Sequence, residues 1–164
     1  SLAWRSWLSG AKGYTYGAGD TAPKCPQGSG GIWRWVTDPE RPDFWQKAIG
    51  WESSRQMQYL HDFLAEVEWW KLESAHDLIV NQPDDVTRRM VLAKVAGQEL
   101  AIAYLPDNNA IEVNLSAFSA PVAAHWFDPV RGRTTPATGV VPNQGTRRFT
   151  PPAKGDWVLV IGQN

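Results

Sequence analysis

The strongest constraint on the fold is a change in sequence pattern near residue 85. After this point, short runs rich in β-branched and aromatic residues alternate with turns made of Gly, Pro, Asn and Asp. Six short strands in about 75 residues are typical of a small antiparallel β-sandwich, which we expect over residues 88–163. The strands are predicted at residues 90–96, 99–105, 110–115, 122–128, 146–150 and 156–162.

Two of these runs also predict which side chains are buried. Residues 111–115 alternate apolar with polar, as in a strand with one buried face. Residues 157–161 are apolar throughout, so we expect that strand to be buried on both faces. Trp126 and Trp157 are therefore expected in the core.

Before residue 85 the pattern is helical, aromatic and rich in loops. A helix is predicted over residues 54–72, and Ser53 followed by Gln56 fits a capping box at its start. The apolar stripe of this helix recurs at helical spacing at Met57, Leu60, Leu64 and Val67. A first helix is predicted from Leu2 to Ser9, closed by Gly10.

A short strand is predicted at residues 13–18, Gly-Tyr-Thr-Tyr-Gly-Ala, followed by a long loop over residues 19–43. Loops of this length inside a compact domain are functional or disordered. This loop carries Trp33 and Trp35, and tryptophan rings normally find something to cover them. The loop is therefore expected to be functional.

Charge and composition exclude several classes of partner. The chain has 16 basic and 17 acidic residues and no basic block, so we expect no nucleic acid partner. It has no long apolar run, so we expect no membrane span. The histidines His61, His76 and His125 have no metal-ligand spacing, and we expect neither a metal nor a cofactor. Cys25 is the single cysteine, which excludes an internal disulfide.

The aromatic residues are the strongest functional signal. The chain has 10 tryptophans, and two tyrosines and two tryptophans cluster in the predicted strand and the loop after it. Flat rings suit the C–H faces of sugars, and their polar edges reach hydroxyls. The alternative is plain core packing, and the sequence does not decide between the two. The candidate substrate-binding residues are Tyr14, Tyr16, Trp33, Trp35 and Asp20, the last because it directly follows the predicted strand.

Several motifs resemble the apiosidase-like glycoside hydrolases. Residues 10–18 followed by Gly31-Ile32-Trp33 resemble the last barrel strand of that family, and Gln56-Met57-x-x-Leu60 resembles its last barrel helix. Two further motifs resemble the β-sandwich that follows the barrel, which is often labelled a collagen-binding domain. They are Trp126-Phe127-Asp128-Pro129-x-x-Gly132 and Gly155-Asp156-Trp157-Val158-Leu159.

The resemblance implies an α/β segment over residues 1–82, made of the last strand and helices of a (β/α)₈ barrel, followed by the all-β antiparallel sandwich. A complete barrel needs about 250 residues, so we expect its earlier strands and both catalytic carboxylates upstream of Ser1. No catalytic residue is therefore assigned here. Two departures from the family bear on substrate specificity: an insertion at residues 19–30, and Tyr14 where the family tends to have His.

Three functions follow as hypotheses. The first is the C-terminal portion of a glycoside hydrolase acting on a polysaccharide or glycoside, with Trp33 stacking on a sugar and Tyr16 donating a hydrogen bond there. The others are a carbohydrate- or collagen-binding module and a structural domain that buttresses the barrel. The expected partners are a carbohydrate and either the N-terminal barrel portion or another chain, which would cover the apolar side of residues 1–82. The expected location is extracellular or periplasmic.

Overall fold

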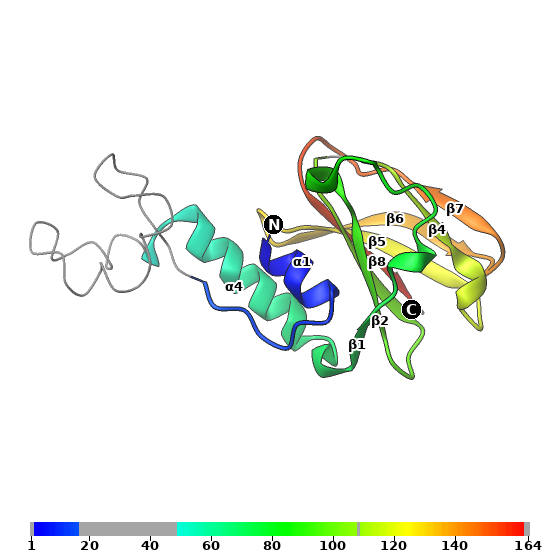
Figure 1. Ribbon diagram of the computed structural model, residues 1–164, viewed down its shortest axis with the longest axis horizontal. Helices are drawn as coiled ribbons and strands as arrows, with labels where there is room; N and C mark the ends of the chain where they lie inside the picture. The colour runs from blue at the N-terminus through cyan, green and yellow to red at the C-terminus, as the bar shows by residue number, and fades with distance from the viewer. Residues whose placement is uncertain (1, 17–48, 108, 163–164) are drawn as a thin grey trace, which may run out of the picture.

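The computed structural model describes residues 2–16, 49–107 and 109–162 (Figure 1). In this part of the chain, helices α1 (Leu2–Leu8) and α4 (Glu52–Ala65) lie beside a β-rich body. Neither helix is long and apolar enough to cross a membrane. The strands are β1 (Leu72–Ser74), β2 (Val91–Val95), β3 (Leu100–Leu105), β4 (Ile111–Asn114), β5 (Val122–Asp128), β6 (Arg133–Val141), β7 (Thr146–Phe149) and β8 (Trp157–Gly162).

The strands form two antiparallel sheets. The larger sheet has the order β1-β2-β3-β8-β5-β6, and the smaller sheet pairs β4 with β7. Each strand predicted after residue 85 has a counterpart here, and the predicted all-β antiparallel half is confirmed. The apolar alternation that predicted β4 is also seen, because Ile111 and Val113 are buried while Glu112 and Asn114 are partly exposed.

Two strands were missed from the sequence. Strand β6 lies at the edge of the larger sheet and contains Pro136 and Gly139, residues that argue against a strand. An edge strand tolerates proline because one side of its backbone needs no partner in the sheet. Strand β1 has only three residues, too few to show a period, and it forms by pairing with β2.

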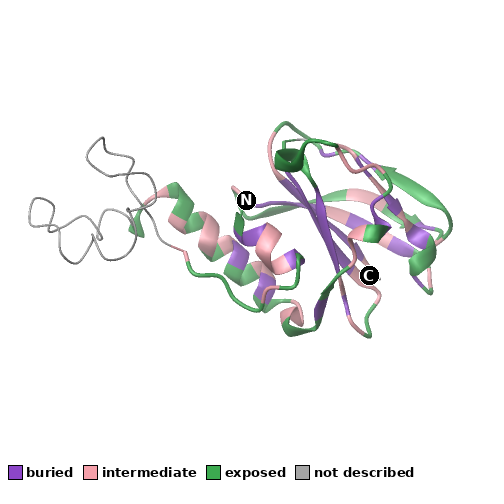
Figure 2. Cartoon of the chain, in the orientation of Figure 1, coloured by how far each residue is buried: buried purple, intermediate pink, exposed green. Residues whose placement is uncertain are grey.

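The larger sheet is buried on both faces along its central strands (Figure 2). One face packs against the smaller sheet in a core that includes Trp126, Trp157 and Leu159. The other face packs against the two helices in a core that includes Val158 and Val160. Strand β8 thus contributes to both cores, as its apolar sequence predicted.

The helices attach to the sheet through aromatic contacts. The ring of Trp4 on α1 lies 6.0 Å from the ring of Phe127 on β5 and 5.1 Å from that of Phe63 on α4. Phe63 and Phe127 lie 4.9 Å apart, so these three rings join both helices and the sheet. The Arg5 guanidinium adds a polar link by donating to the carbonyl oxygens of Val86 and Thr87.

The helix predictions are correct for α1 and partly correct for α4. Helix α1 ends near Gly10, whose φ of 98° lies in the left-handed region that glycine favours. Helix α4 ends at Ala65 instead of residue 72, and a short 3₁₀ helix at Trp69–Lys71 leads into the sheet, where Leu72 pairs with Val95. The predicted capping box is wrong, since the N-cap residue is Trp51 and no side chain caps the helix.

The predicted strand at residues 13–18 is wrong over its described part, because residues 13–16 form no strand. A strand needs a neighbour for its backbone hydrogen bonds, and no described segment pairs with these residues. Instead, the Lys12 ammonium fixes the segment by donating to the carbonyl oxygens of Trp70 and Leu72. The expected barrel segment is therefore not confirmed.

Candidate functional site

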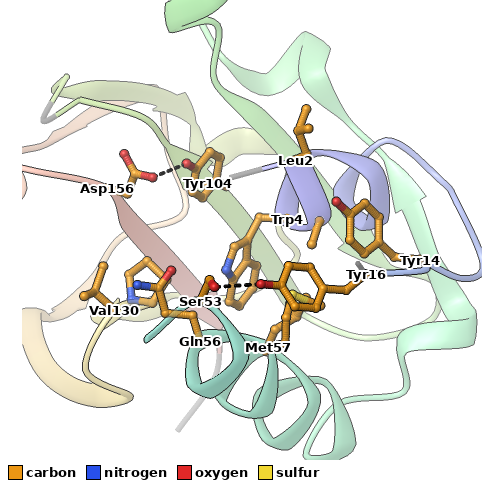
Figure 3. A pocket seen from close by; sticks show the side chains of 13 residues that line it. Leu2, Trp4, Tyr14, Tyr16, Ser53, Gln56, Met57, Tyr104, Val130 and Asp156 are labelled. Atoms are coloured by element: carbon orange, nitrogen blue, oxygen red, sulfur yellow. Dashed lines mark hydrogen bonds between the residues drawn. The ribbon is translucent and has the colours of Figure 1, made fainter. Parts of the chain in front are cut away.

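A cleft of about 230 Å³ lies where the helices meet the β5–β6 turn and the start of β8 (Figure 3). Helices α1 and α4 supply two of its walls, and the segment after α1 supplies Tyr14 and Tyr16. The sandwich supplies a third wall. The sandwich residues are Tyr104, Pro129, Val130 and Asp156.

The structure brings together the two candidate tyrosines that it describes. The Tyr16 hydroxyl donates to the Ser53 hydroxyl at 2.7 Å, and Tyr14 is 37% exposed at the cleft. Both line the cleft although the segment that carries them is not a strand. Trp33, Trp35 and Asp20 lie outside the described residues, so sugar contacts at all five positions stay a prediction.

The cleft also contains a carboxylate, Asp156, that was not among the candidate substrate-binding residues. The buried Tyr104 hydroxyl donates to the Asp156 carboxylate at 2.5 Å, and the Asp107 backbone N–H donates to its other oxygen at 3.3 Å. These bonds fix the carboxylate at the cleft wall. Tyr104 and Asp156 are 52 positions apart in the sequence, so their contact could not be predicted from spacing. The sequence pointed to Asp156 only through the Gly155-Asp156-Trp157 motif.

The β5–β6 turn is built around another carboxylate. Asp128 is 6% exposed and accepts hydrogen bonds from the backbone N–H groups of Val130 and Arg131 at 2.9 and 3.1 Å. The Arg131 guanidinium lies 2.9 Å from the same carboxylate. These contacts hold Pro129 and Val130 in place at the cleft.

A second, more apolar groove of about 390 Å³ runs along the two helices. Tyr14, Met57 and Leu60 line both this groove and the cleft. Trp7 and Trp69 line only the groove, and their rings lie 5.0 Å apart. Tyr14 therefore lies between two concave surfaces.

The histidines occupy three different environments. His61 is exposed beside Asp62, and His76 links strand β2 to the end of α1 through the Leu92 backbone N–H and the Ser9 hydroxyl. Partial burial lowers the pKa of His125 on β5, because desolvation disfavours its charged form. No three metal-ligating side chains gather within the described ranges.

Comparisons with known proteins divide the chain into two adjoining matches. Residues 1–71 match the family model described as "Apiosidase-like, catalytic domain", and residues 74–162 match the one described as "Putative collagen-binding domain of a collagenase". The second match covers more than half of the chain and therefore defines its class. The chain belongs to the collagen-binding-domain family named in the second match, and its residues 1–71 are similar to the apiosidase-like catalytic domain. The resemblance predicted from the motifs is confirmed.

Solved structures show the same fold. One titled "Glycoside hydrolase" has a TM-score of 0.65 at 20% identity, over 73% of this chain and 27% of its own. A glycoside hydrolase family 5 protein from Bacteroides vulgatus ATCC 8482 has a TM-score of 0.64 at 18% identity, over 73% of this chain and 26% of its own. The chain thus spans about a quarter of the length of either structure. No curated protein matches the chain.

Proposed function

We propose that this chain is the C-terminal portion of a glycoside hydrolase that acts on a polysaccharide or glycoside. Its helical part contributes aromatic residues to the sugar site, and its β-sandwich is an accessory domain. The reaction itself needs a pair of carboxylates placed across the scissile bond. We assign neither of them to this chain.

The observation that carries the proposal is the continuity between the two family matches. The apiosidase-like match ends at residue 71 and the sandwich match begins at residue 74. Across that junction, Trp4, Phe63 and Phe127 form one aromatic cluster. A sandwich attached this firmly to the end of a catalytic domain is suited to work with that domain rather than alone.

Within this proposal, the aromatic residues have separate roles. Trp33 stacks on a sugar near the cleavage point and Tyr16 donates a hydrogen bond there, with Tyr14, Trp35 and Asp20 completing the subsite. The Tyr16 hydroxyl has one proton, so its bond to the sugar replaces the one that it donates to Ser53. The position of Tyr14 and Tyr16 at one cleft supports a shared role for these two residues.

A structural buttress is the second candidate, and the shared core favours it. The larger sheet buries one face against α1 and α4, which would hold the end of a barrel in place without any contact to substrate. An autonomous carbohydrate- or collagen-binding module has less support. Trp126 and Trp157 are 2% and 8% exposed, so neither presents a flat ring to a ligand.

The test of the proposal is glycoside hydrolysis by two proteins: this 164-residue chain and the product of the complete reading frame that contains it. Release of reducing sugar from a panel of plant and microbial polysaccharides and of aryl glycosides is measured for both. We expect the complete product to hydrolyse at least one substrate and the chain alone to hydrolyse none. Lack of hydrolysis by a well-folded complete product would leave the buttress as the better interpretation.

Replacement of Trp33 tests the role of the aromatic residues. Loss of a stacking platform at a recognition site typically costs about 1–3 kcal/mol, so Trp33→Ala should reduce kcat/KM of the complete product by about one to two orders of magnitude. The thermal transition of the variant serves as the control for folding. Unchanged kcat/KM in a well-folded variant would return Trp33 to a packing role.

A further inference from the structure

The indole N–H of Trp4 is buried without a hydrogen-bond acceptor. Trp4 is 4% exposed and lines the cleft, yet its Nε1 has no acceptor among the residues that the structure describes. By contrast, Trp157 Nε1 donates to the Ala153 carbonyl oxygen at 2.8 Å. A buried donor normally has a partner, so an unpaired donor at a cavity wall indicates a missing acceptor in that cavity.

The other cleft residues indicate what kind of molecule supplies the acceptor. In Figure 3, Trp4 lies among the hydroxyl of Tyr16, the amide of Gln56 and the carboxylate of Asp156. Donors and acceptors thus surround an otherwise apolar, aromatic space. This combination suits a ligand that has hydroxyl groups on an apolar ring.

We infer that the cleft binds a single neutral sugar ring, with Trp4 Nε1 donating to one ring hydroxyl and the Asp156 carboxylate accepting from others. The choice of a sugar rests on the proposed function. The new element is that the β-sandwich itself contacts the ligand through Asp156, and that α1 contributes through Trp4.

The charge and the size of the cleft disfavour three other kinds of ligand. No Lys or Arg is among the described residues that line the cleft, and the Asp156 carboxylate would repel an anion. The volume of about 230 Å³ falls below the range of about 300–1,000 Å³ that is usual for larger ligands. A phosphate, a uronic acid or an oligosaccharide enclosed along its length is therefore disfavoured.

Nuclear magnetic resonance of the tryptophan indole groups tests this inference on the 164-residue chain. The Trp4 indole signal is identified as the one missing from Trp4→Phe. The chain is then titrated separately with D-glucose, D-galactose, D-xylose, L-arabinose and D-glucuronate. We expect at least one neutral sugar to shift the Trp4 signal to saturation, and D-glucuronate to bind more weakly than D-glucose.

Three variants separate a ligand contact from a structural effect. Loss of one neutral hydrogen bond predicts about fivefold weaker binding in Trp4→Phe, and loss of a charged acceptor predicts about tenfold weaker binding in Asp156→Asn. Trp126→Phe is the matched control. Trp126 also has a buried indole N–H without an acceptor in the described part of the chain, but it lies on the opposite face of the larger sheet. Trp126→Phe should therefore leave the affinity for the sugar unchanged.

The inference is overturned if no neutral sugar shifts the Trp4 signal, if Asp156→Asn binds as tightly as the original chain, or if D-glucuronate binds as tightly as D-glucose. Thermal transitions check that each variant folds. If Trp4→Phe does not fold, Asp156→Asn still tests the inference, because the asparagine keeps an oxygen that accepts from Tyr104. Hydrolysis by the complete product without sugar binding at this cleft would overturn this inference alone. Sugar binding without hydrolysis would instead count against the proposed function.

Discussion

Gly132 shows how a single residue fits the β5–β6 turn against helix α4. Its φ is 64°, and a Cβ at this position would lie 2.7 Å from Cδ1 of Tyr59. We expect Gly132→Ala to cost about 1–2 kcal/mol for the left-handed backbone, plus a further cost for displacing the Tyr59 ring. Urea denaturation measures the loss. Gly97→Ala is the control, because Gly97 has a φ of 75° with open space around its Cβ position, and equal losses would show that the Tyr59 contact is unimportant.

His125 predicts a pH dependence of stability. Burial lowers its pKa in the folded protein below the ordinary value of 6.5, so the unfolded chain binds the proton more tightly. The stability that depends on neutral His125 is therefore complete above pH 6.5 and is lost as the pH falls through the lower, folded-state pKa. Urea midpoints measured across this range should fall less in His125→Gln than in the original chain. An identical pH profile for both proteins would exclude His125 as the cause.

At the residue scale, the sequence predicted which residues are buried better than it predicted which residues contact each other. Trp126 and Trp157 were placed in the core from their strand patterns, and both are buried. The bond between Tyr104 and Asp156 joins positions 52 residues apart, and no local pattern encodes that separation. The contact of Gly132 with Tyr59 is likewise invisible, because it depends on how a helix lies on a sheet.

At the scale of elements, the start of α4 shows that a capping-box sequence does not always form a capping hydrogen bond. The Ser53 hydroxyl does not cap the helix but accepts a hydrogen bond from Tyr16 at an exposed position. Ser53→Ala should therefore cost less than about 0.5 kcal/mol, whereas loss of a true capping residue costs about 0.5–2 kcal/mol. Asp85→Ala is the comparison, because the Asp85 side chain accepts from the Thr87 backbone N–H at the start of a short helical turn. A larger loss in Ser53→Ala, measured by urea denaturation, would restore the capping box.

Elements were predictable where local pattern and tertiary pairing agree. The strands after residue 85 combine apolar runs with turn residues, and nearby strands complete their hydrogen bonds. At residues 13–16 the β-prone sequence has no strand beside it among the described residues, and no strand forms. At the end of α4 the reverse holds, because the predicted helix gives way to a turn and a short 3₁₀ helix at Trp69–Lys71 before β1 pairs with β2.

At the scale of the whole molecule, the helices and the sandwich share one core. Trp4 and Leu8 of α1 and Leu60 and Leu64 of α4 bury one face of the larger sheet. Strand β1 lies within residues 1–82 but forms its backbone hydrogen bonds with β2, which lies within residues 88–163. Each part therefore needs the other to complete its core and its backbone hydrogen bonds, and the free energy of unfolding of the chain depends on both.

This dependence predicts how the two parts behave when separated. Residues 1–82 expressed alone would expose Leu8, Leu60 and Leu64, which the sheet and helices bury together, and would leave β1 without a partner. We therefore expect this piece to be poorly folded or self-associated, whereas the full chain should unfold in one cooperative transition. Calorimetry and sedimentation, at several protein concentrations, compare the piece with the full chain. A sharp, concentration-independent transition of residues 1–82 as a monomer would show that the helical part is stable without the sandwich, and that the shared core is only a contact between two independent units.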